Sequence, residues 1–127
     1  AVVLQIEDAE AIAEAGRIAA VPGVDALFIG RVDLTVSLGC ARTDAPEVVD
    51  AVQRICAAAA RAGTAVGMFV ADPAEARQWT AHGASLFILG SDQGFLLSGA
   101  RAVLVNAWTA RSAALLERHY QPYAVRH

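Results

Sequence analysis

The chain alternates, four times over, between short apolar runs and segments whose apolar residues recur at helical spacing. Short apolar runs suit buried strands, and parallel strands can be joined only by a long crossover, which is usually a helix. The alternation therefore predicts an α/β fold with a parallel sheet. The expected strands are residues 2–6, 25–29, 65–70 and 86–89, and the expected helices are residues 9–20, 44–63, 72–83 and 93–108, with a pattern that could extend the last helix to 119.

Local signals place the ends of these helices. Asp44-Ala45-Pro46-Glu47 and Asp72-Pro73-Ala74-Glu75 each combine an Asp cap, a Pro in the first turn and a Glu three residues after the Asp, as helix N-termini do. Gly63 follows the second helical pattern and predicts its end. Between Asp33 and Gly39 we expect a loop with one short helical turn.

The composition bounds the classes of function. The 127 residues suffice for one domain with a core, and 56% of them are hydrophobic, which suits helices packed on a parallel sheet. A net charge of -3 gives no indication of a nucleic-acid partner or of an acidic membrane surface. No run approaches the roughly 20 apolar residues of a membrane span, and no charged-then-apolar signal peptide opens the chain. We therefore expect a cytoplasmic protein.

Two residue types narrow the chemistry. All ten basic residues are Arg, so the chain cannot supply the Lys of a Schiff base, of a pyridoxal-phosphate site or of a phosphate-binding loop. The two cysteines are too few and too far apart for a zinc knuckle or a redox pair. Cys56 lies on an apolar helical pattern and is predicted to be a small buried hydrophobe, whereas Cys40 is predicted to be an ordinary free thiol.

Two carboxylates follow the first two apolar runs. Glu7 comes directly after the first run, and Asp33 comes shortly after the second. The carboxyl ends of parallel strands meet at one rim of the sheet, which is where α/β folds bind ligands. Each acid also has a structural interpretation, since Glu7 could cap the helix that begins near Asp8 and Asp33 could cap the turn at 34–36. Taken together on adjacent strand ends, the two acids favour a metal site.

Paired carboxylates are what Mg²⁺-like ions usually take from a protein, with water and substrate completing the octahedron. Side chains alternate along a strand, so Gln5 shares a face with Glu7. Such an open site can bind a 2-oxo acid through its carboxylate and keto oxygens. The metal would then stabilise the enolate that forms when the neighbouring carbon–carbon bond breaks.

An ordered set of short motifs points to a known family. The motifs are Gln5-Ile6-Glu7, Pro22-Gly23-Val24-Asp25, Phe28-Ile29-Gly30 with Asp33-Leu34, Ser37-Leu38-Gly39 and Gly90-Ser91-Asp92. In this order and spacing they resemble the HpcH/HpaI aldolase family (2-oxo-acid aldolases, citrate lyase-like), over residues 2–104. The resemblance implies a (β/α)8 TIM barrel and a divalent-metal-dependent class II aldolase. Such an enzyme cleaves hydroxy-2-oxo acids to pyruvate and an aldehyde.

The resemblance assigns roles by position. Glu7 and Asp33 would be the metal ligands, with Mg²⁺, Mn²⁺ or Co²⁺ as the cofactor. Gln5 would line the pyruvate pocket, and the backbone N–H groups of Val32 and Asp33 would hold the carboxylate of the 2-oxo acid. Arg31 stands where the family usually has Pro. It would either bind a second carboxylate or a phosphate on the substrate or point into solvent, and we favour the solvated interpretation.

The βα units of this chain correspond to half of the eight in such a barrel. We expect residues 1–110 to form the C-terminal half of the barrel and residues 111–127 a helical extension or tail. The resemblance places the catalytic Arg and His in the other half, so no catalytic residue is identified here and the chain alone is expected to be incomplete for activity. Exposed sheet edges would favour a homo-oligomer, or a complement by the missing N-terminal half-barrel.

Two alternatives remain open at this stage. One is a malyl- or citramalyl-thioester lyase of the same superfamily. The other is a non-catalytic α/β fragment or association module. A receiver-like signalling domain would need a Lys late in the chain, and the sequence has none.

Overall fold

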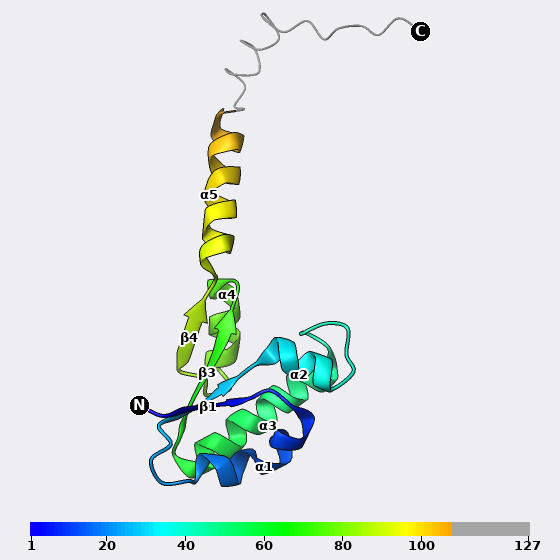
Figure 1. Ribbon diagram of the computed structural model, residues 1–127, viewed down its shortest axis with the longest axis vertical. Helices are drawn as coiled ribbons and strands as arrows, with labels where there is room; N and C mark the ends of the chain where they lie inside the picture. The colour runs from blue at the N-terminus through cyan, green and yellow to red at the C-terminus, as the bar shows by residue number, and fades with distance from the viewer. Residues whose placement is uncertain (108–127) are drawn as a thin grey trace, which may run out of the picture. The chain divides into compact units, whose positions relative to one another are not determined.

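The structure is a computed structural model that describes the backbone of residues 1–107 (Figure 1). Every predicted strand and helix is present, with ends shifted by a few residues. The predicted tail at 111–127 lies outside the described residues. In chain order the elements are β1 (Val3–Ile6), α1 (Ala9–Ala19), β2 (Ala26–Ile29), α2 (Arg31–Ser37), α3 (Pro46–Ala62), β3 (Ala65–Val70), α4 (Pro73–Thr80), β4 (Leu86–Leu89) and α5 (Asp92–Ala107).

The four strands form one sheet in the order β1-β2-β3-β4, and every neighbouring pair is parallel. The register aligns Gln5 with Phe28 and Ile6 with Ile29. The fold therefore confirms the predicted α/β class with a parallel sheet. Because all strands run the same way, their carboxyl ends lie at one rim, where the segments after β1, β2 and β3 come together.

One face of the sheet is buried against helices. α1 and α3 pack against each other beneath the strands (Figure 1). The opposite face carries Gln5, Phe69 and Ile88, which are exposed. The strands thus have a helix-covered side and an open side, as expected for βα units of a barrel. The largest fully buried side chains on the covered side are Ile6, Leu27, Ile29, Leu34, Ile55 and Met68.

The segment after β2 is more regular than the sequence predicted. Instead of a loop with one turn, residues Arg31–Ser37 form the helix α2 with Gly30 as its N-cap, which provides no side-chain hydrogen bond. This helix carries little signal in the sequence because a Gly cap lacks the usual capping oxygen. Tertiary packing stabilises it instead, since Leu34 is fully buried and the hydroxyl of Ser37 accepts the N–H of Ala9 at 2.9 Å.

The predicted start of α3 is also corrected. Its N-cap is Ala45, not Asp44. The Asp44 carboxylate instead accepts a hydrogen bond from Arg42 Nε at 2.7 Å, and the guanidinium of Arg42 lowers the pKa of Asp44. The Asp44 carboxylate therefore pairs with Arg42 and does not cap α3. The other end follows the prediction, since Gly63 is the left-handed C-cap with φ 73°.

The described residues divide into two units, 1–90 and the segment from 91 onward. In the second unit, α5 begins where Ser91 Oγ accepts the N–H of Gly94 at 3.1 Å and Asp92 Oδ1 accepts that of Gln93 at 2.8 Å. Phe95 on this helix is 59% exposed. None of the helices described is both long enough and apolar enough to cross a membrane.

Candidate functional site

Glu7 and Asp33 lie at the same rim of the sheet. Glu7 follows β1 directly, and the N–H of Gly30 donates to the carbonyl of Ile6 at 3.0 Å, which ties the ends of β1 and β2 together. Asp33 stands in the first turn of α2, three residues after its Gly30 cap. The fold therefore brings the two predicted ligands to adjacent strand ends, as the sequence suggested. Their binding of a metal remains a prediction.

Gly30 makes this arrangement possible by its lack of a side chain. A Cβ at position 30 would stand 2.9 Å from Gln5 Nε2, 2.9 Å from Glu7 Cβ and 3.1 Å from Glu7 Oε2. These distances are far below normal contact, so any larger residue would displace the two side chains. Gly30 has φ -80°, which other residues adopt freely, so the requirement for Gly is steric. The sequence motif contained Gly30, but its role became visible only in three dimensions.

The capping interpretations of the two acids do not hold. Asp8, not Glu7, is the N-cap of α1, and its Oδ1 accepts the N–H of Ala11 at 2.7 Å. The N-cap of α2 is Gly30, so Asp33 is not a cap either. Glu7 instead accepts a hydrogen bond from Gln5 Nε2 at 2.5 Å, which orients the carboxylate at the rim. A carboxylate has further lone pairs, so this bond leaves Glu7 able to bind a cation.

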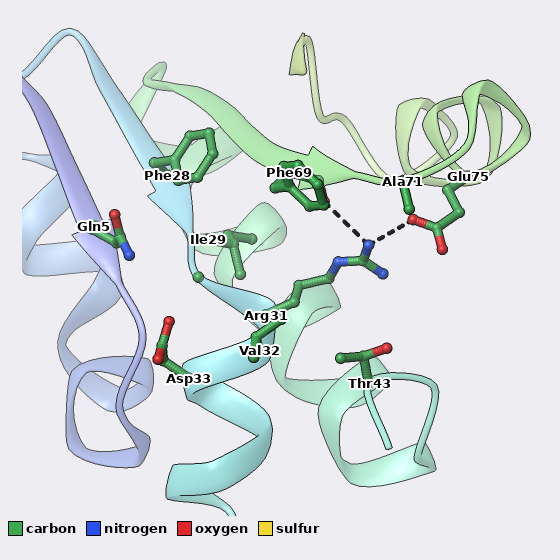
Figure 2. A pocket seen from close by; sticks show the side chains of 11 residues that line it. Gln5, Phe28, Ile29, Arg31, Val32, Asp33, Thr43, Phe69, Ala71 and Glu75 are labelled. Carbon is green, nitrogen blue, oxygen red and sulfur yellow. Dashed lines mark hydrogen bonds and ion pairs between the residues drawn. The ribbon is translucent and has the colours of Figure 1, made fainter. Parts of the chain in front are cut away.

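A pocket of about 320 Å³ is lined by Gln5 and Asp33 but not by Glu7 (Figure 2). Gln5 and Asp33 lie at one end of it, and Arg31 and Glu75 lie at the other. The predicted substrate-binding residues Gln5, Val32, Asp33 and Arg31 thus border a single cavity, although their binding of a substrate is untested. The remaining lining residues are Phe28, Ile29, Gly30, Thr43, Phe69 and Ala71.

Arg31 is not solvated, which corrects the interpretation favoured from the sequence. Its side chain is only 12% exposed. Nη2 donates to Glu75 Oε2 at 2.7 Å and to the carbonyl of Phe69 at 3.1 Å. The guanidinium carbon also lies 5.4 Å from the ring centroid of Trp79, within cation–π range. Arg31 Nε and Trp79 Nε1 are buried without a hydrogen-bond partner in the described part of the chain.

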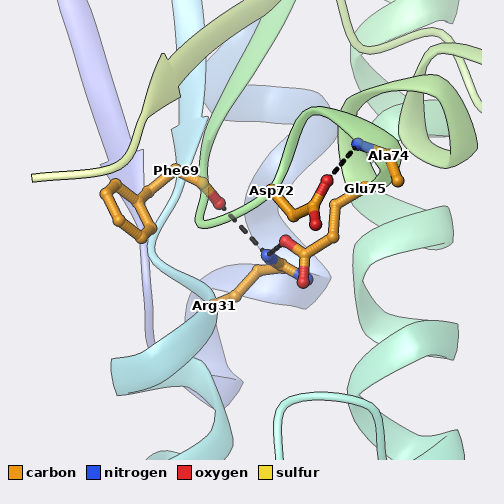
Figure 3. Close-up of polar contacts among 5 residues, drawn as sticks. All are labelled: Arg31, Phe69, Asp72, Ala74 and Glu75. Carbon is orange, nitrogen blue, oxygen red and sulfur yellow. Dashed lines mark hydrogen bonds and ion pairs between the residues drawn. The ribbon is translucent and has the colours of Figure 1, made fainter. Parts of the chain in front are cut away.

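The sequence missed Glu75 as a site residue because its pattern had another explanation. Glu75 follows the N-cap Asp72 by three residues, the position from which a capping box would reach back to the cap. Asp72 does cap α4, since its Oδ1 accepts the N–H of Ala74 at 2.7 Å. The Glu75 carboxylate binds Arg31 instead (Figure 3). The unusual Arg31 was the only sequence signal that an acidic partner was needed.

The donor set fits an ion that needs few protein ligands. Among residues described, no group of three or more His, Cys, Asp or Glu side chains could surround a metal. Two carboxylates at one rim of the sheet match a Mg²⁺-like ion, which keeps several waters and takes substrate oxygens. They do not match a closed four-ligand zinc site. The close packing of Gly30 against Glu7, which leaves no room for a side chain at position 30, also agrees with a carboxylate site here.

Consecutive parallel βα units in the strand order β1-β2-β3-β4, with a pocket at the carboxyl rim, are the arrangement found in βα barrels. Residues 1–99 match the family model "HpcH/HpaI aldolase/citrate lyase". The chain therefore belongs to the HpcH/HpaI aldolase/citrate lyase family, which confirms the resemblance noted in its motifs.

Similar proteins agree with this assignment. The chain is 40% identical over 105 residues to a hydroxypyruvate/pyruvate aldolase of Paraburkholderia phytofirmans, covering 82% of this chain and 40% of the relative. It is 36% identical over 98 residues to a 5-keto-4-deoxy-D-glucarate aldolase of Klebsiella pneumoniae, covering 76% and 38%. A crystal structure of an HpcH/HpaI family protein from Burkholderia cenocepacia superposes with a TM-score of 0.80 at 42% identity, covering 84% of this chain and 42% of that one. The chain thus spans about 40% of the length of these relatives.

Proposed function

We propose that this chain supplies the metal-holding part of the active site of a class II aldolase. The reaction would cleave a carbon–carbon bond of a hydroxy-2-oxo acid to give pyruvate and an aldehyde. The observation that carries the proposal is the placement of Glu7 and Asp33 at adjacent strand ends, with Gly30 packed against Glu7 and a pocket that Asp33 lines. The names of the relatives, which are aldolases of oxo acids, support the reaction class.

Glu7 and Asp33 would hold the cation, and Gln5 would keep Glu7 oriented through its 2.5 Å hydrogen bond. A bound Mg²⁺, Mn²⁺ or Co²⁺ would supply positive charge next to the oxygen on which negative charge grows as the carbon–carbon bond breaks. The N–H groups of Val32 and Asp33 belong to the first turn of α2, where backbone donors need partners outside the helix. They would bind the substrate carboxylate.

Titration of the 127-residue chain with Mn²⁺ tests the metal site directly, because the electron paramagnetic resonance signal of free Mn²⁺ reports binding without any turnover. We expect one site per chain. Glu7→Gln and Asp33→Asn should each weaken binding by about tenfold or more, because each removes a charged oxygen ligand.

Matched controls separate ligand loss from a change in net charge. Glu14→Gln removes an exposed Glu of α1 that pairs with Arg17, and Asp50→Asn removes an exposed Asp of α3 that lies near Arg54. Both controls should leave Mn²⁺ binding unchanged. Equal binding in the wild type, Glu7→Gln and Asp33→Asn would contradict the proposed site.

Activity itself requires more of the barrel. The edges of the sheet, β1 and β4, have no further strand beside them in the described part of the chain, and Phe69, Leu86 and Ile88 are exposed. We propose that a second copy or a first half-barrel completes the enzyme. With eight βα units present, the protein should cleave 2-oxo-4-hydroxy acids only when a divalent metal is added, whereas the chain alone should show little turnover. Activity that survives a chelator would contradict a metal mechanism.

A further inference from the structure

The end of the pocket away from Asp33 carries two opposite charges. Arg31 and Glu75 face each other there across a 2.7 Å ion pair (Figure 2). An unpaired Arg in this place would attract a second carboxylate on a substrate. The pair instead presents a wall with no net charge, because Glu75 neutralises Arg31.

Arg31 is fixed in this pairing from several sides. The carbonyl of Phe69 accepts a second hydrogen bond from the same Nη2 atom at 3.1 Å, and the ring of Trp79 lies 5.4 Å from the guanidinium carbon. Trp79 is itself 2% exposed, so the ring cannot move aside easily. With its own side chain 12% exposed, Arg31 has little freedom to leave Glu75 and turn toward a ligand.

Glu75 is the more accessible partner. Its side chain is 39% exposed and lines the pocket, whereas that of Arg31 is largely covered. A ligand that reaches this end would therefore meet a carboxylate first. The pair as a whole is neutral, but a second carboxylate on the ligand would meet the exposed Glu75 oxygens before it reached Arg31 and would be repelled at short range. A hydroxyl group could instead donate a hydrogen bond to Glu75. Thr43, which is half-buried in the lining, offers a further hydroxyl.

We infer that Glu75 determines specificity by masking Arg31, so that the pocket accepts an uncharged, hydroxyl-bearing aldehyde portion and rejects one that carries a carboxylate. This inference rests on the proposed function, in which the 2-oxo acid end of the ligand lies near Asp33. It assigns to Arg31 the role of positioning Glu75, and not that of binding a substrate carboxylate. The discrimination comes from repulsion of the wrong ligand as much as from attraction of the right one.

Two 2-oxo acids of equal chain length provide the test. 2-Oxopentanoate ends in a methyl group, and 2-oxoglutarate ends in a carboxylate. Their binding to the Mn²⁺-loaded chain is measured by calorimetry for the wild type, for Glu75→Gln and for Glu14→Gln. The last variant makes the same substitution in an ion pair of α1 with the same 2.7 Å distance, outside the pocket.

The wild type should bind 2-oxopentanoate more tightly than 2-oxoglutarate, by about tenfold. Glu75→Gln should raise the affinity for 2-oxoglutarate by about tenfold and change that for 2-oxopentanoate by less than about twofold, because only the charged end meets residue 75. Glu14→Gln should match the wild type. Tighter binding of 2-oxoglutarate by the wild type, or an unchanged preference in Glu75→Gln, would overturn the inference.

A second measurement needs no metal. The chain has two Trp residues, Trp79 and Trp108, so Trp108→Phe leaves Trp79 as its one Trp. Succinate is titrated against the Trp108→Phe chain with and without Glu75→Gln, and the fluorescence of Trp79 reports anion binding at the neighbouring guanidinium. A change in Trp79 fluorescence that occurs only with Glu75→Gln supports the masking of Arg31. The absence of a change in both chains contradicts it. If neither 2-oxo acid binds any variant, the proposed function fails, while the succinate titration still decides whether Glu75 masks Arg31.

Discussion

Gly30 and Glu7 approach so closely that a Cβ on residue 30 would stand 2.9 Å from the Cβ of Glu7. This contact joins two adjacent strand ends at the rim, because the N–H of Gly30 also donates to the carbonyl of Ile6. The position of the Glu7 carboxylate therefore depends on the absence of a side chain one strand away.

Gly30→Ala should displace Gln5 and Glu7 and weaken Mn²⁺ binding by about tenfold. Overpacking of this kind costs about 1–3 kcal/mol of unfolding free energy, which urea denaturation would measure. Gly16→Ala is the control, because the nearest atom to a Cβ there is Ala58 Cβ at an ordinary 3.9 Å. The control should keep Mn²⁺ affinity and gain up to about 1 kcal/mol from helix propensity. Equal Mn²⁺ affinity in both variants would contradict the claim that the position of Glu7 depends on the absence of a side chain at residue 30.

Asp8 and Glu7 are adjacent acids with different roles, and substitution should separate them. Asp8→Ala removes the N-cap of α1 and should lower the free energy of unfolding by about 1 kcal/mol without changing Mn²⁺ affinity. Glu7→Gln should weaken Mn²⁺ binding and leave the free energy of unfolding unchanged, because Glu7 caps no helix. Denaturation curves and Mn²⁺ titrations of both variants check the prediction. If only Asp8→Ala lost Mn²⁺ binding, Asp8 and not Glu7 would be the metal ligand, and the prediction would be contradicted.

Much of the fold could be predicted because strand and helix patterns are local. The alternation of apolar runs and helical spacing gave the parallel sheet, and Gly63 gave the end of α3. The helix α2 was predicted only as a loop with one short helical turn, because its stability comes from the burial of Leu34, a tertiary effect that leaves no periodic signal in seven residues.

The site was predicted in part for the same reason. The placement of Glu7 and Asp33 at one rim of the sheet could be predicted because each follows its own strand. The partners of Arg31 could not, because Glu75 lies 44 residues away and was already accounted for by a capping pattern. Long-range ion pairs of this kind depend on how β2 and β3 are paired in the sheet, which a single sequence does not specify in detail.

Gly63 offers a test of backbone conformation alone. Its φ of 73° lies in the left-handed region, and no atom of the described residues lies within 4 Å of a Cβ built there. Gly63→Ala should therefore cost about 1 kcal/mol through strain and not through a clash. Gly63→Asn should cost less, because Asn tolerates this conformation better. Urea denaturation measures both, and Mn²⁺ affinity should stay constant because Gly63 precedes β3, at the opposite rim. A larger loss in Gly63→Asn than in Gly63→Ala would contradict the conformational explanation.

The two thiols should differ in reactivity. Cys56 is buried in α3, and burial raises the pKa of its thiol above the ordinary value, whereas Cys40 is partly exposed. Only the thiolate reacts with Ellman's reagent, so a raised pKa keeps Cys56 protonated at a pH where an exposed thiol has begun to ionise. In the folded chain near pH 8, Cys40 should be labelled first and Cys56 slowly. Cys40→Ser isolates the slow phase, which should quicken as the pH rises and become fast in denaturant. If Cys56 in folded Cys40→Ser reacted as fast as in denaturant, the buried position of Cys56 in α3 would be wrong.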